Sequence, residues 1–514
     1  MANVQLFNSL LRQLPVTDTR NAEAAPAYTL SPRHTLAQLA MTGCLNHTFY
    51  AEAEMQLEQV LELTRELTPE YIAKTAIYCR TKGHMKDMPA LLLAILAARH
   101  SEVFGVAFER VIDSGKMLRN FVQILRSGAT GRKSLGTRPK KLVQAWLNSA
   151  SEQQLLSAAI GQKPTLADIV KMVHPKPQEA WRAAFFAWLI GKPFDHAALP
   201  PAVQSLLRFR AEGGDLPEVP FLLLSNESLN TAQWAELARR MSWQALRMNL
   251  NTLARNGVFE VDGMAGKIAA KLADKTSVLK ARAYPYQLLA AYLMTGQAVP
   301  SVVRNALQDA LEVSLANVPK LEGRVVVCPD VSGSMSSPVT GYRKGASSSV
   351  RCIDVAALMA AAVLRKHPGA RVLPFENKVV QVELNPRDSV VSNASKLAAI
   401  GGGGTNCSAP LAQLVHERAK VDVVIMVSDN QSWVDARKGA TETMRQWTLL
   451  KRTNPQARLI CIDLQPYADT QAQERSDVLN VGGFGDVVFD VIGQFASGQF
   501  GETHWVDAIE AVKL

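Results

Sequence analysis

The chain of 514 residues is 47% hydrophobic and 20% charged, and its formal net charge is +10. This composition excludes a disordered or low-complexity protein, and a guide of about 150 residues per domain suggests roughly three domains. The first residues lack the charged start and apolar block of a secretory signal. No run approaches the ~18 apolar residues of a membrane span, so we expect a cytoplasmic protein without a membrane partner.

From about residue 28 to 318, the apolar residues have helical spacing. In segment 51–67, the residues that would share one face of a helix are Leu57, Val60, Leu61, Thr64 and Leu67. Thr68 and Pro69 then suit the N-cap and first turn of another helix. Similar segments occupy 88–100, 101–112, 141–150, 179–190, 201–212, 242–256, 285–296 and 301–318. So many amphipathic helices in series predict a HEAT-like helical repeat, with a compact irregular α-domain as the alternative.

Positive charge is concentrated in the helical part. Residues 1–320 hold 36 Lys and Arg against 26 Asp and Glu, whereas residues 321–514 hold 20 of each. The densest basic stretch has no acidic residue between its cations, which are Arg126, Arg132, Lys133, Arg138, Lys140 and Lys141. These residues lie in a Gly/Ser/Thr loop that enters a helix at Pro139, and they could neutralise nucleic-acid phosphates in a salt-dependent way. A solvated basic loop is the alternative.

Two smaller basic groups are further candidates for binding a polyanion. Lys171, His174 and Lys176 are grouped, and the first two lie about one helical turn apart, so they can share a face. A structural histidine is the alternative there. Arg255 is expected at the end of a helix, just before Gly257. The alternative is a structural role, in which the positive charge of the arginine stabilises the C-terminal end of the helix dipole.

The pattern changes at Leu321. Short runs rich in Val and Ile are expected to be strands at 323–330, 370–376, 378–384, 421–430, 457–465 and 486–492. Helical segments separate most of them, at 355–366, 409–420 and 440–452. This alternation predicts a mainly parallel, doubly wound α/β sheet that binds ligands at the carboxyl ends of its strands. We therefore predict a helical domain over 1–320 and an α/β domain over 321–514.

Oxygen-bearing side chains cluster at these strand ends. Asp330, Ser332 and Ser334 follow the first strand at alternate positions, so their oxygens can converge on one point. Thr405 follows four glycines, and Asp429 ends the strand at 421–430. Such donors, without thiol or imidazole, suit a divalent cation, Mg²⁺ first and Mn²⁺ or Ca²⁺ as alternatives. A polar turn without an ion is the other interpretation.

The motifs DVSGS, GGGGTN and VSDN together resemble the metal-ion-dependent adhesion site of von Willebrand factor A domains. This resemblance implies that Asp330, Ser332 and Ser334 ligate the ion directly. It also implies that Thr405 and Asp429 act directly or through water. So few charged ligands would leave positions open for water or an outside carboxylate. The six cysteines (44, 79, 328, 352, 407 and 461) lack zinc-ligand spacing and are expected to be reduced core residues.

Over nearly its whole length the chain resembles the Ro autoantigen family, in which a helical TROVE domain precedes a von Willebrand A-like domain. The resemblance is carried by residues 26–50, MVHPKP, LNTLARNG, ARAYPYQLL and SDNQSW. It implies a ring of helices that binds small Y-like RNAs outside and single-stranded RNA 3′ ends in its hole. Lys171, His174 and Lys176 would then lie on the outer surface, while residues 126–141 and Arg255 would face RNA. Within the SDNQSW motif, Gln431 occupies a position at which the motif of the animal members has an acidic residue.

We therefore expect a non-catalytic RNA-binding protein acting in RNA quality control or decay, without DNA specificity. The family resemblance adds polynucleotide phosphorylase as a partner reached through the RNA. The alternative is a protein-interaction scaffold whose metal site captures a partner carboxylate. A metal-dependent hydrolase is disfavoured, because only Asp330 and Asp429 converge and two-metal phosphoryl chemistry usually needs several carboxylates.

Overall fold

The computed structural model describes residues 14–514 except 44, 162, 226, 282, 284, 319, 343–349, 434–439, 466, 484, 486 and 499–503. The chain forms two compact units, which are described separately. The helical unit contains Thr68–Leu272, Thr295–Val303 and Lys513–Leu514. The sheet unit contains the chain up to Leu67, Ala273–Met294 and Arg304–Val512. Among the described residues, no helix is both long and apolar enough to cross a membrane.

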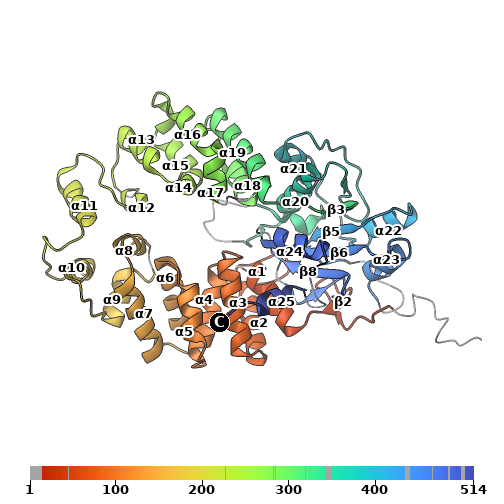
Figure 1. The fold of residues 1–514 in the computed structure, drawn as a ribbon, viewed down its shortest axis with the longest axis horizontal. Helices are drawn as coiled ribbons and strands as arrows, with labels where there is room; N and C mark the ends of the chain where they lie inside the picture. Colours follow the sequence, from red (N-terminus) through yellow and green to blue (C-terminus); the bar gives the residue numbers. More distant parts are fainter. Residues whose placement is uncertain are drawn as a thin grey trace, which may run out of the picture. The chain divides into compact units, whose positions relative to one another are not determined.

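The helical unit is built from short helices that follow one another along the chain (Figure 1). They are α3 (Pro69–Thr81), α4 (Asp87–Ala98), α5 (Phe104–Val111), α6 (Gly115–Arg126), α7 (Thr137–Ser149), α8 (Glu152–Ala158), α9 (Leu166–Val173), α10 (Ala180–Leu189), α11 (Pro201–Glu212), α12 (Phe221–Leu224), α13 (Thr231–Arg240), α14 (Trp243–Met248), α15 (Leu250–Arg255), η2 (Val258–Glu260) and most of α16 (Met264–Ala273). The predicted cap is confirmed, because the Thr68 side chain accepts a hydrogen bond from the Tyr71 amide. The segment predicted as one helix over 242–256 divides at Asn249.

Helices close in sequence pack against one another in this unit. α3 contacts α4 and α5, α4 contacts α6, and α9 contacts α6, α7 and α10. α4 is buried along nearly its whole length, and the rings of Phe104, Phe108 and Phe121 pack together beside it. Neighbour-on-neighbour packing is what amphipathic helices in series require to bury their apolar faces, as the sequence predicts.

The sheet unit contains a five-stranded parallel sheet in the order β4-β3-β5-β6-β8. Its strands are β3 (Val325–Pro329), β4 (Arg371–Val372), β5 (Val423–Ser428), β6 (Arg458–Asp463) and β8 (Val478–Gly482). The helices after the first strand are α20 (Cys352–Lys366), α21 (Val390–Ala398), α22 (Ala409–His416), α23 (Glu442–Lys451), α24 (Val487–Ala496) and α25 (His504–Glu510), and η4 (Gly333–Ser336) is a short turn. The predicted parallel α/β sheet is confirmed.

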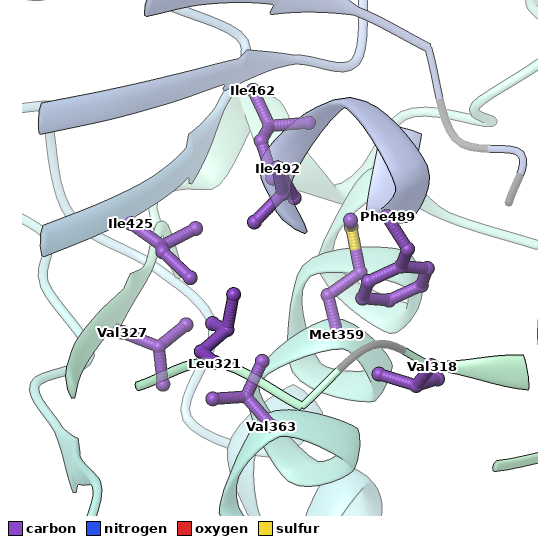
Figure 2. Close-up of a pocket in the computed structure, with 9 residues that line it drawn as sticks. All are labelled: Val318, Leu321, Val327, Met359, Val363, Ile425, Ile462, Phe489 and Ile492. Atoms are coloured by element: carbon purple, nitrogen blue, oxygen red, sulfur yellow. The ribbon is translucent and has the colours of Figure 1, made fainter. Parts of the chain in front are cut away.

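The two faces of this sheet are covered by different helices. Side chains on one face, including Val326 and Val424, form a core with residues of α22 and α23. The alternate residues Val327, Ile425 and Ile462 face α20 and α24 (Figure 2). A cavity of about 10 Å³ remains there, and all nine residues that line it are apolar. It is too small and too apolar for a ligand, so it belongs to the core.

Two of the expected strands are wrong. Residues 378–384 form no strand, although Val379 makes an isolated bridge with Phe375. Of the expected strand at 486–492, residue 486 lies outside the described residues and 487–492 fall instead on α24, where Val488, Val491, Ile492 and Phe495 are buried at helical spacing. The fifth strand is β8, which the sequence pattern did not reveal because a buried asparagine, Asn480, interrupts its apolar run.

The sheet unit also includes segments from the predicted helical region. These are β1 (Thr19–Arg20), β2 (Pro26–Thr29), α1 (Pro32–Thr42), α2 (Ala53–Glu66), α17 (Lys275–Lys280), α18 (Pro285–Met294), most of α19 (Ser301–Ser314) and η3 (Leu315–Asn317). β2 pairs with β1 and, on its other side, with β7 (Asp469–Thr470). The N-terminal segment is thus attached to the loop between β6 and β8. Of the cysteines, five are free and buried as predicted, and Cys44 lies outside the described residues.

Candidate metal centre and cationic cleft

The predicted metal ligands meet where β3 and β5 end side by side. Asp330 directly follows β3 and Asp429 directly follows β5. The amide of Asp330 donates a 2.9 Å hydrogen bond to the carbonyl of Val427, which continues the pairing of the two strands to this point. After β3 the chain continues to β4 on one side, whereas β5 lies on the other side. This is a topological switch point, the place where α/β sheets bind ligands.

Hydrogen bonds hold the Asp330 carboxylate in place. Its Oδ1 accepts a 2.8 Å hydrogen bond from the Ser332 amide, and its Oδ2 accepts a 2.5 Å hydrogen bond from the Ser428 hydroxyl. The hydroxyl oxygens of Ser332 and Ser334 lie 3.4 Å apart. Alternate residues after β3 therefore present three oxygens together, as their spacing predicts.

The glycine loop brings Thr405 to the same place. Gly402 donates to the carbonyl of Val331, and Gly333 donates to the carbonyl of Gly403, each at 3.1 Å. Gly403 has φ +73° and lies so close to Glu376 that a β-carbon would collide with its carboxylate. Thr405 is buried, and its carbonyl accepts a 3.2 Å hydrogen bond from the Trp433 amide. The loops after β3 and β5 and the loop between α21 and α22 thus carry the five predicted ligands, all of which are buried.

The cluster contains two carboxylates away from water. Asp330 is 0% exposed and Asp429 is 1% exposed. Burial, and next the negative charge of Asp429, raise the pKa of Asp330 to about 7, and burial also raises the pKa of Asp429. Asp429 Oδ2 is buried and has no hydrogen-bond partner among the described residues. Two neighbouring buried carboxylates with an unpaired oxygen and several hydroxyls fit a hard divalent cation, which would supply the missing positive charge.

The basic stretch forms an open cleft of about 640 Å³ in the helical unit. We call it the cationic cleft; the side chains that define it are Arg126, Lys133, Lys140, Lys141, Gln144 and Met172. Gly136 and Thr137, at the start of α7, also line it. Four of the six predicted cations are therefore gathered on one surface.

The other two cations of the stretch are engaged in the fold. Arg132 donates a 2.9 Å hydrogen bond to the carbonyl of Ala97, at the end of α4. Arg138 donates to the carbonyls of Ser101 and Glu102 at 2.8 and 2.7 Å, and its guanidinium lies 5.9 Å from the centroid of the Phe104 ring. Arg132 thus binds a carbonyl in the last turn of α4, and Arg138 binds carbonyls of the loop between α4 and α5.

The second predicted basic group lies next to the cationic cleft. Gln144 of α7 donates hydrogen bonds to the carbonyls of Val173 at 2.5 Å and His174 at 3.3 Å, at the end of α9. His174 has φ +52° and is exposed, as are Lys171 and Lys176. These three residues therefore extend the basic surface of the cleft. Arg255 is exposed at the end of α15, where its guanidinium bonds the Thr252 hydroxyl.

The lysines of the cleft are placed where they do not stabilise their own helix. Lys140 and Lys141 lie near the N-terminus of α7, which has no acidic residue in its first turn and no side-chain cap at Gly136. The helix dipole opposes positive side chains at this end and favours bound anions. Lys140 and Lys141 are therefore better placed to bind a phosphate than to stabilise α7.

Sequence reasoning missed several residues around the metal cluster. Ser428, next to Asp429 in the chain, is a direct partner of Asp330. Gln431 is fully buried, and its oxygen accepts a 2.8 Å hydrogen bond from the amide of Ala22. Gln431 of the SDNQSW motif thus fastens the N-terminal segment. The SDNQSW motif singles out Gln431 in the sequence, but its spacing does not predict the bond to Ala22.

Comparison with known proteins agrees with this architecture. Residues 216–323 match the family model of the TROVE domain, and residues 324–496 match that of the Ro60 vWA domain. RNA-binding protein RO60 of Deinococcus radiodurans is 25% identical over 527 residues, which cover 95% of this chain and 97% of that protein. RNA-binding protein RO60 of Caenorhabditis elegans is 23% identical over 271 residues, which cover 50% of this chain and 41% of that protein.

A solved structure has the same fold. The crystal structure of the Deinococcus radiodurans RO (RSR) protein matches with a TM-score of 0.59 and 22% identity, covering 91% of this chain and 100% of that chain. A helix-rich region followed by a von Willebrand A-type domain with a parallel five-stranded sheet is therefore the fold of this chain, as predicted.

Proposed function

This chain belongs to the Ro family of TROVE-domain proteins, and from that premise we propose that it is a non-catalytic RNA-binding protein. The two relatives that this chain matches carry the name RNA-binding protein. The observation that carries the proposal is the cationic cleft, in which Arg126, Lys133, Lys140 and Lys141 face one open space. RNA binding agrees with the basic excess of the helical part of the chain.

Phosphate contacts supply the affinity in this proposal. Lysine and arginine displace the counterions that surround a nucleic-acid backbone, so binding weakens as salt rises. The cleft is open and lined by flexible side chains, and it has no array of aromatic rings among its lining residues that would stack successive bases. We therefore assign it to the backbone of RNA rather than to reading a sequence.

The RNAs we propose are small structured Y-like RNAs and RNAs with single-stranded 3′ ends. Lys171, His174 and Lys176 extend the basic surface beyond the cleft, which gives a structured RNA room to make several phosphate contacts. The role would be RNA quality control or decay, with polynucleotide phosphorylase reached through the bound RNA. Neither DNA specificity nor turnover of the RNA is part of the proposal.

Electrophoretic or filter binding of the full chain at two salt concentrations tests it. The probes are a hairpin RNA with a single-stranded 3′ tail, the same hairpin without the tail, and a DNA copy. Salt-sensitive binding of both RNAs, strongest for the tailed one, is expected. Salt-insensitive binding, no binding, or equal binding of the DNA copy would contradict the proposal.

We propose a second function for the sheet unit, the capture of a partner carboxylate by a divalent cation. The buried oxygens of Asp330, Asp429 and the three hydroxyl residues support it, because they leave a hard cation few charged ligands. Mg²⁺ is the first candidate, with Mn²⁺ and Ca²⁺ as alternatives. Chelation separates the two functions: RNA binding should survive it, whereas a metal-bridged partner should dissociate.

A further inference from the structure

The N-terminal segment of the chain is fastened next to the metal cluster. Asn21 is buried, and the nitrogen of its side-chain amide (Nδ2) donates a 2.6 Å hydrogen bond to the backbone carbonyl of Ser432. The amide of Ala22 bonds the side chain of Gln431 at 2.8 Å. Gln431 and Ser432 come two and three residues after Asp429. The segment is therefore held by the same loop that carries a predicted metal ligand, and all these residues belong to the sheet unit.

This attachment brings Glu23 to the cluster. Its carboxylate accepts a 2.6 Å hydrogen bond from the hydroxyl of Tyr50, and its own side chain is exposed. Glu23 directly follows Ala22, whose amide bonds Gln431 two residues after Asp429, so the backbone of Glu23 lies beside the loop that carries this predicted ligand. Burial raises the pKa of Tyr50, and the nearby charges of Glu23 and Asp429 contribute to the rise. Tyr50 therefore orients the Glu23 carboxylate next to the loop that carries Asp429.

A second tyrosine completes the surroundings. The rings of Tyr50 and Tyr467 pack edge to face with centroids 6.0 Å apart. The Tyr467 hydroxyl is buried and, like Asp429 Oδ2, has no hydrogen-bond partner among the described residues. The charge of Asp429 contributes to the raised pKa of Tyr467, after burial. Two buried oxygens of the sheet unit, one on a predicted ligand and one on the ring that packs against Tyr50, therefore have no hydrogen-bond partner among the described residues.

Three carboxylates in this arrangement repel one another unless a cation lies among them. Asp330 and Asp429 are buried, and Glu23 adds a third negative charge from a separate segment. A divalent cation neutralises two of the three charges and makes the approach of the third favourable. A site with few charged protein ligands also keeps positions open for a further carboxylate.

We propose that Glu23, positioned by Tyr50, is an internal carboxylate ligand that caps the cation bound by Asp330 and its neighbours. The proposal rests on the metal site proposed above, and it assigns to the N-terminal segment the position that an external carboxylate would take. An acidic partner must then compete with Glu23. The site is therefore closed by its own chain when no partner is present.

Mn²⁺ titration of the full chain, with free Mn²⁺ measured by electron paramagnetic resonance, tests this inference. Glu23→Gln is expected to weaken Mn²⁺ binding on the order of tenfold, and Tyr50→Phe by less, because it removes only the bond that positions the carboxylate. The matched control is Glu62→Gln, which removes another exposed carboxylate of the sheet unit, on α2 and outside the His47, Glu52 and Glu54 group. This control should bind Mn²⁺ as the wild type does.

Acetate provides a readout that a merely structural role would not give. Added acetate should restore Mn²⁺ affinity in Glu23→Gln, because it can occupy the vacated position, and it should change the wild type little. Equal Mn²⁺ affinity of the wild type and Glu23→Gln, or the absence of acetate rescue, would overturn the internal ligand alone. Mn²⁺ binding by the wild type that Asp330→Asn leaves unchanged, or no binding at all, would overturn the metal site as well. RNA binding should be unaffected by all of these variants, so the two proposals fail separately.

Discussion

The side-chain amide of Gln144 donates a 2.5 Å hydrogen bond to the carbonyl of Val173, and this bond ties α7 to the end of α9. Lys140 and Lys141 lie at the start of α7, while Lys171 and His174 lie at the end of α9. Two basic groups that are about thirty residues apart in the sequence are therefore neighbours on one surface. The extended basic surface of the proposed RNA site depends on this connection.

Gln144→Ala should weaken RNA binding a few-fold and lower the free energy of unfolding by about 1 kcal/mol, because a hydrogen bond to a helix end is lost. Fluorescence anisotropy with the tailed hairpin and urea unfolding measure the two effects. Gln154→Ala is the matched control, since it removes the capping-box glutamine of α8 and leaves the cleft intact. The role assigned to Gln144 would be wrong if both variants bound RNA equally well at matched stability.

Arg138→Ala should act mainly on stability. The variant loses hydrogen bonds to Ser101 and Glu102 and the contact with Phe104, and the expected cost is about 1–2 kcal/mol. RNA affinity, measured well below the melting temperature, should keep the salt dependence of the wild type, because this guanidinium is already bound to carbonyl groups. A reduced salt slope with unchanged stability would place Arg138 on the RNA instead.

Mg²⁺ should stabilise the wild type against thermal unfolding. A ligand that binds the folded state alone adds about 2.7 kcal/mol at a hundredfold excess over its Kd. Asp330→Asn should abolish the Mg²⁺ effect and, in the presence of a chelator, should melt higher than the wild type because one of two repelling buried charges is gone.

The control for this experiment is Asp215→Asn, an exposed carboxylate of the helical unit, which should retain the full response to Mg²⁺. Equal Mg²⁺ stabilisation of Asp330→Asn and the wild type would contradict the metal site.

Glu474 should make stability depend on pH. Its buried carboxylate accepts hydrogen bonds from the amide and the side chain of Asn480, and burial raises its pKa to about 8. The unfolded chain releases this proton near pH 4.5, whereas the folded chain keeps it until about pH 8. The folded state therefore holds the extra proton between these values. The free energy of unfolding falls as the pH rises through that window, by at most about 1.4 kcal/mol per pH unit from this group.

Urea unfolding with a chelator between about pH 5 and pH 8 measures this slope. Glu474→Gln should flatten it, because the amide does not titrate. Asp422→Asn should not change it, since hydrogen bonding to Arg324 lowers the pKa of Asp422 to about 2, outside the window. An identical slope in the wild type and Glu474→Gln would show that the carboxylate does not hold its proton.

The sequence predicted the features that depend on local spacing. Thr68 was predicted as a helix cap because Pro69 and an amphipathic segment follow it in the sequence. Asp330 and Asp429 were predicted to meet because each follows a strand, and the two strands are parallel neighbours. The prediction was wrong where the hydrophobic periodicity was ambiguous. The valines of segment 486–492 indicated a strand, but they lie on α24. Short apolar runs cannot distinguish the two states until their tertiary partners are known.

Contacts between distant segments were beyond the reach of spacing. Arg132 and Arg138 look the same as their basic neighbours in the sequence, but their partners are carbonyl groups about 35 residues earlier in the chain. The two-residue strand β7 and its pairing with β2 carry no pattern of their own, so the docking of Asn21 and Glu23 beside the metal cluster was not foreseen. Such contacts are set by the folded chain as a whole.

The most direct test of RNA binding is the salt dependence of the triple variant Lys133→Gln, Lys140→Gln and Lys141→Gln. Each lost phosphate contact should reduce the slope of log affinity against log salt by ~0.7 for single-stranded RNA, so the variant should lose about two units of slope and bind markedly less tightly at low salt. Replacing two exposed lysines outside the cleft, Lys82 and Lys192, should change neither quantity. A triple variant that folds normally and keeps the slope and affinity of the wild type would contradict the assignment of RNA to the cationic cleft.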